Sequence, residues 1–126
     1  MRKTIGILSF ALCACMGCVS YHTPPMDRRI TVSPDMGTSI WVTDVRLAKA
    51  HSQHYTLQVN VVNNTGSVVR MEYKVVWLDA NGLEIPSIVS IWQMMSAASH
   101  EVVGLTATAP SPDAVDFRFY VRPARY

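Results

Sequence analysis

The fold is decided by a stretch near the middle of the chain, which reads Met71-Glu72-Tyr73-Lys74-Val75-Val76-Trp77. Every second residue from Met71 to Trp77 is apolar. Successive side chains of a β-strand point to opposite faces, so this pattern predicts a strand with one face in a hydrophobic core. The repeat is two residues rather than the roughly 3.6 of an amphipathic helix.

Similar alternation occurs on both sides of this stretch. Further strands are predicted at residues 41–47, 55–61, 102–107 and 117–122. Residues 88–92 fit either a strand or the start of a short helix to Ala98. Turn-forming residues separate these segments at 63–66, 79–82 and 109–113. Six or seven short strands at this spacing predict an all-β fold, an immunoglobulin-like antiparallel β-sandwich.

The N-terminal segment has the layout of a secretory signal peptide. Met1-Arg2-Lys3 supplies a positive start, and a short apolar run follows as far as Leu12. A helix that spans a bilayer needs about 20 mostly apolar residues, so this run is a poor anchor by itself. We therefore expect it to direct export and to be removed.

The three cysteines of the chain are Cys13, Cys15 and Cys18, all directly after this run. No disulfide can therefore form within the folded domain. The stretch Leu12-Cys13-Ala14-Cys15 resembles a bacterial lipobox, which implies that Cys15 becomes the acylated first residue. Acylation at Cys18 is the alternative, and a plain signal peptide with unmodified cysteines is the third possibility. Neither Met16 nor Val19 is the Asp that resembles an inner-membrane retention signal, which implies the outer membrane.

Three regions are predicted along the chain. Residues 1–14 are a lipoprotein signal peptide, 15–37 a flexible tether, and 38–126 the β-sandwich domain. Within the tether, Ile30-Thr31-Val32 can add a short edge strand that Pro34 would end. Without Arg2 and Lys3, nine basic side chains face nine acidic ones. A neutral mature protein has no electrostatic reason to bind nucleic acid.

Part of the sequence resembles a known family. The stretch from Tyr73 to Gly82, followed by Trp92, Ala109-Pro110 and Asp116-Phe117-Arg118-Phe119, is similar to the YcfL-like bacterial lipoproteins. The resemblance covers roughly residues 40–122. It implies an immunoglobulin-like sandwich held at the periplasmic face of the outer membrane by acyl chains. It implies no catalytic residue.

We find little in the sequence that predicts catalysis or a cofactor. The domain has no Cys, and its serines lack the setting of an activated nucleophile. Asp79 and Glu84 flank a turn, and turn formation explains Asp79 more simply than glycosidase chemistry. The residues His51, His54, His100, Met94 and Met95 suggest a copper site only weakly, because a blue-copper site needs a thiolate. Exposed histidines and core methionines are the expected alternative.

The sequence thus favours a non-enzymatic binding or scaffold module of the cell envelope. Trp77 continues an apolar face and is expected in the core, whereas Trp92 is the best candidate for a surface contact with a ligand. The edge of a sandwich can accept a strand from a partner, so an envelope protein is the expected partner. Alternative functions are peptidoglycan or glycan binding through Trp92 and, less favoured, copper binding.

Overall fold

The structure is a computed structural model that describes residues 27–125. The described residues form seven strands and one short 3-10 helix. They are β1 (Ile30–Val32), η1 (Pro34–Met36), β2 (Ile40–Lys49), β3 (Tyr55–Asn63), β4 (Val69–Leu78), β5 (Gln93–Ala97), β6 (Val102–Thr108) and β7 (Asp116–Pro123). No described helix is long and apolar enough to cross a lipid bilayer.

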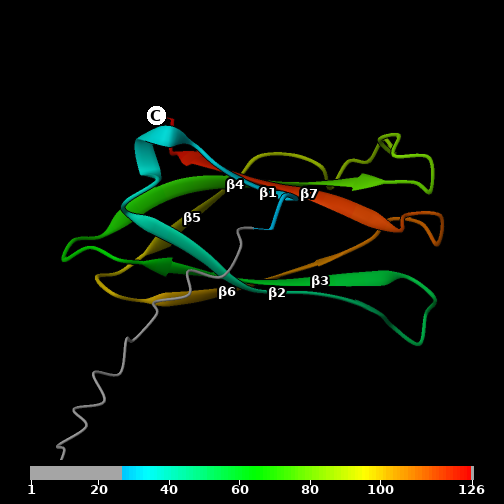
Figure 1. Cartoon of the computed structure of the whole chain (residues 1–126), viewed down its shortest axis with the longest axis horizontal. Coiled ribbons are helices and arrows are strands. Elements are labelled where there is room, and N and C mark those ends of the chain that lie inside the picture. The colour runs from blue at the N-terminus through cyan, green and yellow to red at the C-terminus, as the bar shows by residue number, and fades with distance from the viewer. Residues whose placement is uncertain (1–26, 126) are drawn as a thin grey trace, which may run out of the picture.

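The strands form two stacked sheets, as Figure 1 shows. One sheet has four strands in the order β1-β7-β4-β5, and the other has three in the order β2-β3-β6. All pairs are antiparallel except β1 with β7, which is parallel. The predicted β-sandwich is confirmed.

The core lies between the sheets and is built from the alternating positions of the sequence. The inward faces of β3, β4 and β7 supply most of it; their most deeply buried large side chains are Leu57, Val59, Val61, Met71, Trp77, Phe117 and Phe119. Trp77 and Phe117 meet edge to face with ring centroids 6.4 Å apart. The prediction that Trp77 lies in the core is therefore confirmed.

The folded part begins earlier than the predicted boundary at residue 38. Ile30 of β1 and Met36 of η1 are buried members of the core cluster, although both lie within the predicted tether 15–37. β1 pairs with β7, and Ser33 N–H donates to the Val121 carbonyl. Prolines and charges marked this stretch as irregular, but its apolar side chains cover the core where β7 would otherwise be an edge.

The prediction of a strand or helix at residues 88–92 is wrong. These residues belong to the long connection between β4 and β5, and β5 begins only at Gln93. The connection starts with a tight turn in which Gly82 has a φ of 78°, and a single bridge joins Leu78 to Glu84. The chain then passes outside the four-stranded sheet (Figure 1). Ile88 and Ile91 are consequently exposed rather than part of a sheet.

A buried asparagine ties together the loops at one end of the sandwich. Asn63 Nδ2 donates to the carbonyls of Ser67, Ala97 and Ala98 at 2.7, 3.1 and 2.9 Å. Its Oδ1 accepts from the backbone N–H and the hydroxyl of Thr65. One fully buried side chain therefore fixes the β3–β4 loop against the turn between β5 and β6.

Candidate functional site

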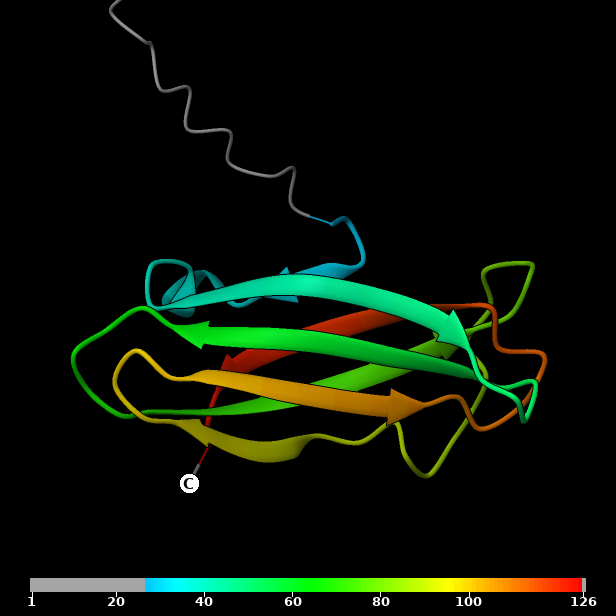
Figure 2. The same ribbon diagram turned by 90° about the horizontal axis from the view of Figure 1, so that it is seen from below.

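The two lateral sides of the sandwich have very different edges. Along one side run β1 and β2, and along the other run β5 and β6 (Figure 2). An edge strand exposes unpaired backbone groups, which natural proteins protect with short strands, charges, prolines or bulges. We define these as the β1–β2 side and the β5–β6 side.

The β1–β2 side carries several of these protective features. β1 has three residues, and β2 bears charged residues at Asp44, Arg46 and Lys49. The pairing of β2 with β3 shifts register between Thr43 and Arg46, and Asp44 has a φ of 51°. Such an irregularity bends a strand and hinders the addition of another.

Apart from the short length of β5, the β5–β6 side has none of them. β5 reads Gln-Met-Met-Ser-Ala and β6 reads Val-Val-Gly-Leu-Thr-Ala-Thr, without a charged residue or a proline. Between Ile85 and Pro112, Glu101 is the one Asp, Glu, Lys or Arg in the sequence. Seven residues of β6 thus form a regular, uncharged and unprotected edge.

The hydrogen-bond pattern identifies the free backbone groups of β6. Ala109 N–H donates to the Tyr55 carbonyl, and the Glu101 carbonyl accepts from Asn63 N–H, so both residues face β3. Because backbone direction alternates along a strand, the odd-numbered residues of β6 face β3. The N–H and C=O groups of Val102, Gly104, Thr106 and Thr108 therefore point to the open edge.

A groove of about 270 Å³ lies beside this edge, between the two sheets. Its walls come from β4, β6 and the residues just before and at the start of β5; they are Tyr73, Val75, Trp77, Val89, Gln93, Thr106, Ala107 and Thr108. Tyr73 Oη donates to Gln93 Oε1 at 3.1 Å across its mouth. The lining of the groove mixes apolar and polar groups, with threonines along the β6 wall.

The groove exists because β5 is much shorter than β4. The pairing of the two strands stops at Tyr73 with Gln93, and the chain next returns to β4 where Ile85 N–H donates to the Trp77 carbonyl. Between these points Val75 pairs only with Phe119 of β7. The inward face of β4 around Val75 is therefore accessible from the side of the sandwich where β6 lies.

The described chain begins on the opposite side. Asp27 precedes β1, and Figure 2 shows β1 and β2 along one lateral side with β5 and β6 along the other. Arg29 holds this entry in place, because its guanidinium contacts Asp27 at 2.8 Å and Asp116 at 3.4 Å. The hydrogen bond from Arg29 lowers the pKa of the Asp27 carboxyl.

Trp92, the predicted ligand contact, is half-buried over the outer face of the four-stranded sheet. The Arg122 guanidinium lies 3.6 Å from its ring centroid, and Lys74 Nζ lies 5.0 Å away. Glu72 fixes Arg122 with a 2.7 Å ion pair, and that hydrogen bond lowers the pKa of the Glu72 carboxyl. A cation thus already covers part of the ring that a sugar would stack upon.

The candidate copper ligands are not brought together. His51 and His54 lie in the β2–β3 connection, whereas His100 lies in the β5–β6 turn at the other end of β6. Seven strand residues, about 23 Å at roughly 3.3 Å each, separate the two ends. One ion therefore cannot bind all three histidines. Among residues 27–125, no group of three His, Cys, Asp or Glu side chains is placed to hold a metal.

Asp79 has the role in the turn that the sequence favours. Its Oδ1 accepts from the backbone N–H groups of Asn81 and Leu83 at 2.9 and 3.0 Å. The proposed acylation sites Cys15 and Cys18 lie outside the described residues.

Sequence reasoning considered a sandwich edge in general but did not identify β6 or its groove. The available signal was the near absence of charge between Ile85 and Pro112. Its meaning depended on strand order, since the same composition in a central strand would be ordinary core sequence.

Comparisons with known proteins agree with this fold. A family model described as a protein of unknown function (DUF1425) matches residues 28–123. The crystal structure of a DUF1425 family member from Shewanella sp. pv-4 superposes with a TM-score of 0.63 at 23% identity, covering 69% of this chain and 80% of that one. Campylobacter jejuni cj0090 gives 0.64 at 19% identity, covering 78% and 100%. No curated protein matches the sequence. At these identities the solved structures support the fold alone.

Proposed function

This chain belongs to the DUF1425 family, and we propose that it is a non-enzymatic, lipid-anchored binding module of the cell envelope. Its partner is a protein that contributes an extended segment along β6. The observation that carries this proposal is the unprotected β6 edge, which lies beside a groove with an aromatic and aliphatic wall from β4.

The chemistry of the edge defines the partner segment. Added strands bind through backbone hydrogen bonds, while pockets for alternate side chains provide specificity. Val102, Gly104, Thr106 and Thr108 offer these backbone groups, and no charged side chain of β6 opposes them. A side chain that enters the groove meets Tyr73, Trp77 and Val89. The partner segment is therefore extended and uncharged, with an apolar residue opposite the groove.

Features of the N-terminal sequence support the envelope location. The positive start, the short apolar run and the lipobox-like stretch before Cys15 are typical of exported lipoproteins, as is the resemblance to the YcfL-like family. Three acyl chains on Cys15, or on Cys18, would hold the protein at the periplasmic face of the outer membrane. The β5–β6 side would then face laterally, away from the side on which the described chain begins.

Mass spectrometry of the mature N-terminus tests the anchor separately from the edge. We expect cleavage before Cys15 or Cys18 and a mass increase that corresponds to acylation. A processed chain with free thiols in the aqueous fraction would contradict the anchor and leave the proposal for β6 standing.

Site-specific photocrosslinking in cells tests the edge. A photoreactive residue at Thr108 should capture one envelope protein, whereas one at Gln58, exposed on the central strand β3, should not. Thr106→Pro removes one outward N–H group without touching the β3 ladder, and Thr106→Ala keeps that group. We expect the Thr108 crosslink to be lost with Thr106→Pro and retained with Thr106→Ala. Equal capture in both variants would overturn the proposed mode of binding.

A further inference from the structure

The outer face of the four-stranded sheet is rich in cations. β4 and β7 point Arg70, Lys74, Arg118 and Arg122 outward, because these positions alternate with the core residues. Glu72 and Asp116 are the carboxylates that these two strands place on the same face. The corresponding face of β3 and β6 carries no charged residue.

Two of the cations have no acidic partner within the described part of the chain. No carboxylate of residues 27–125 forms an ion pair with Lys74 or Arg70. Lys74 Nζ instead lies 5.0 Å from the Trp92 ring centroid and 5.6 Å from that of Tyr120. These charges are therefore available to an anion that approaches from outside the sheet.

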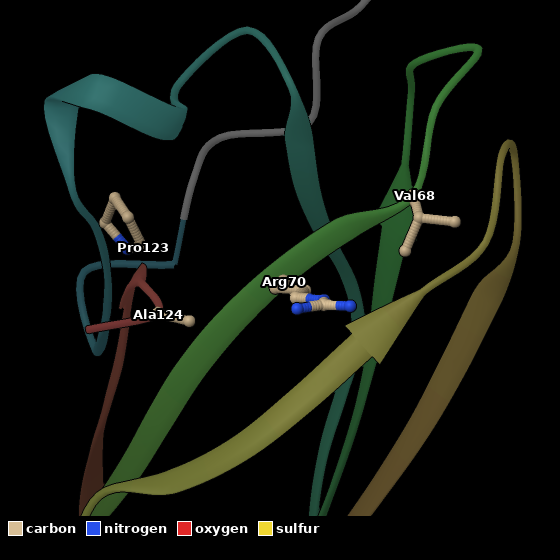
Figure 3. Close-up of a pocket in the computed structure, with 4 residues that line it drawn as sticks. All are labelled: Val68, Arg70, Pro123 and Ala124. Carbon is tan, nitrogen blue, oxygen red and sulfur yellow. The ribbon is translucent and has the colours of Figure 1, made fainter. Parts of the chain in front are cut away.

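A hollow of about 530 Å³ extends this face at the start of β4. Val68 and Arg70 form one wall, and Pro123 and Ala124 at the end of β7 form the other, as Figure 3 shows. The hollow places a guanidinium beside apolar surface, which suits an anionic group attached to a hydrocarbon.

Exposed aliphatic side chains border the same face. The β4–β5 connection runs outside the four-stranded sheet (Figure 1), and it exposes 64% of Leu83, 91% of Ile88 and 56% of Ile91. Met94 of β5, which pairs opposite Glu72, is 70% exposed. Clusters of exposed apolar residues usually mark a binding surface for protein or membrane.

We propose that this face rests on an anionic lipid surface. Lys and Arg reach headgroup phosphates, Trp and Tyr favour the boundary between water and hydrocarbon, and aliphatic side chains enter the hydrocarbon. Cations, aromatic rings and aliphatics occur together here around Trp92. An acidic protein would complement the cations but not the exposed aliphatic border.

The contact works together with the lipid anchor of the proposed function. A tethered domain stays at a high effective concentration near the membrane, so a weak surface contact is sufficient to orient it. With this face on the lipid, the three-stranded sheet points away from the membrane and the β6 edge remains open at the side. The face would thus set the orientation in which a partner meets β6.

Vesicle flotation of residues 27–126 tests the contact without the anchor. This fragment contains the whole described core cluster, from Ile30 to Val121, and lacks Cys15 and Cys18. A thermal unfolding measurement should first show that the fragment unfolds cooperatively and is therefore folded. We expect it to float with vesicles of phosphatidylcholine and phosphatidylglycerol, and to bind less to phosphatidylcholine alone or at high salt.

Two sets of variants identify the surface. The double variant Ile88→Ser/Ile91→Ser, and separately Lys74→Gln, should each lower the floated fraction by about threefold or more. Val102→Ser removes a similarly exposed side chain from β6 and should leave flotation unchanged. Failure of the fragment to float with anionic vesicles, or an equal loss with Val102→Ser, would overturn the proposal. Binding to another acidic macromolecule in place of vesicles would assign the face to that partner instead.

Discussion

The β1–β2 side and the β5–β6 side of this sandwich differ in how well their edge strands are protected against the addition of another strand. On the β1–β2 side, buried Ile30 and Met36 seal the core, and the bulge and charges of β2 discourage added strands. On the β5–β6 side, a seven-residue edge without charge borders a groove into the core. Under the proposed function, the first side serves stability and the second serves binding, so substitutions on the two sides should have different consequences.

Removal of β1 and η1, which cover the core on the β1–β2 side, should have the largest effect on stability. A fragment of residues 38–126 lacks β1 and η1, and it exposes Phe119 and Val121 as well as losing two buried side chains. Each large apolar side chain contributes about 1.5–3 kcal/mol. We therefore expect a loss of about 5 kcal/mol in the free energy of unfolding relative to residues 27–126, measured by urea denaturation. Equal urea midpoints would show that this side is not a structural seal.

Asn63→Ala should have the next largest effect. It removes a hydrogen bond from three carbonyls and from the Thr65 N–H. The Ser67 and Ala98 carbonyls still accept from the Thr65 hydroxyl and the Glu101 N–H, and each buried group left unsatisfied costs about 1–3 kcal/mol. Relaxation and water will recover part of this, so we expect a loss of about 3 kcal/mol. Asn64→Ala, at an exposed neighbouring position, should change stability by less than about 0.5 kcal/mol. Similar losses in both variants would contradict the role of Asn63.

Acid should weaken the contacts that hold the chain entry on the β1–β2 side. The hydrogen bond from Arg29 lowers the pKa of Asp27 below its ordinary value of 3.8. A carboxyl with a lowered folded pKa stabilises the fold above its unfolded pKa, and this contribution is lost as pH falls through the folded pKa. Asp27→Asn should therefore lower stability near neutral pH by at most about 1 kcal/mol and flatten its decline below about pH 4. An unchanged acid profile in urea denaturation would contradict this.

Charge at the β6 edge should have the smallest effect on stability. Thr106→Lys places a charge at an exposed position of β6 that is not part of the core cluster. We expect the free energy of unfolding to change by less than about 0.5 kcal/mol, while capture of the partner is lost. A loss of stability above about 1.5 kcal/mol would mean that this edge is structural as well.

Much of the sandwich could be predicted because its alternation is local. Trp77, Phe119 and Val61 lie where period two places them. The wrong assignment of residues 88–92 arose because an apolar run has the same composition in a strand and in an exposed loop. The short strand at Ile30–Val32 was predicted, but it was assigned to the tether, because its contribution to the core becomes evident only when it lies beside β7.

The candidate site was harder to predict because it depends on strand order. Nothing in the sequence of β6 distinguishes an edge strand from a central one. Trp92 stays a predicted ligand contact, and its packing against Arg122 could not be predicted because it joins residues of distant segments. Asn63 was predicted to be part of a turn. Its burial could not be predicted, because it depends on contacts with Ala97 and Ala98, which are distant in sequence.

Amide hydrogen exchange along β6 tests the central claim most directly. In the free protein, the amides of Val103, Leu105 and Ala107 should be protected by β3, whereas those of Gly104, Thr106 and Thr108 should exchange rapidly. When the crosslinked partner is bound, the second set should become protected too. Protection of the even-numbered amides in the free protein, or their continued rapid exchange in the complex, would contradict a partner strand at this edge.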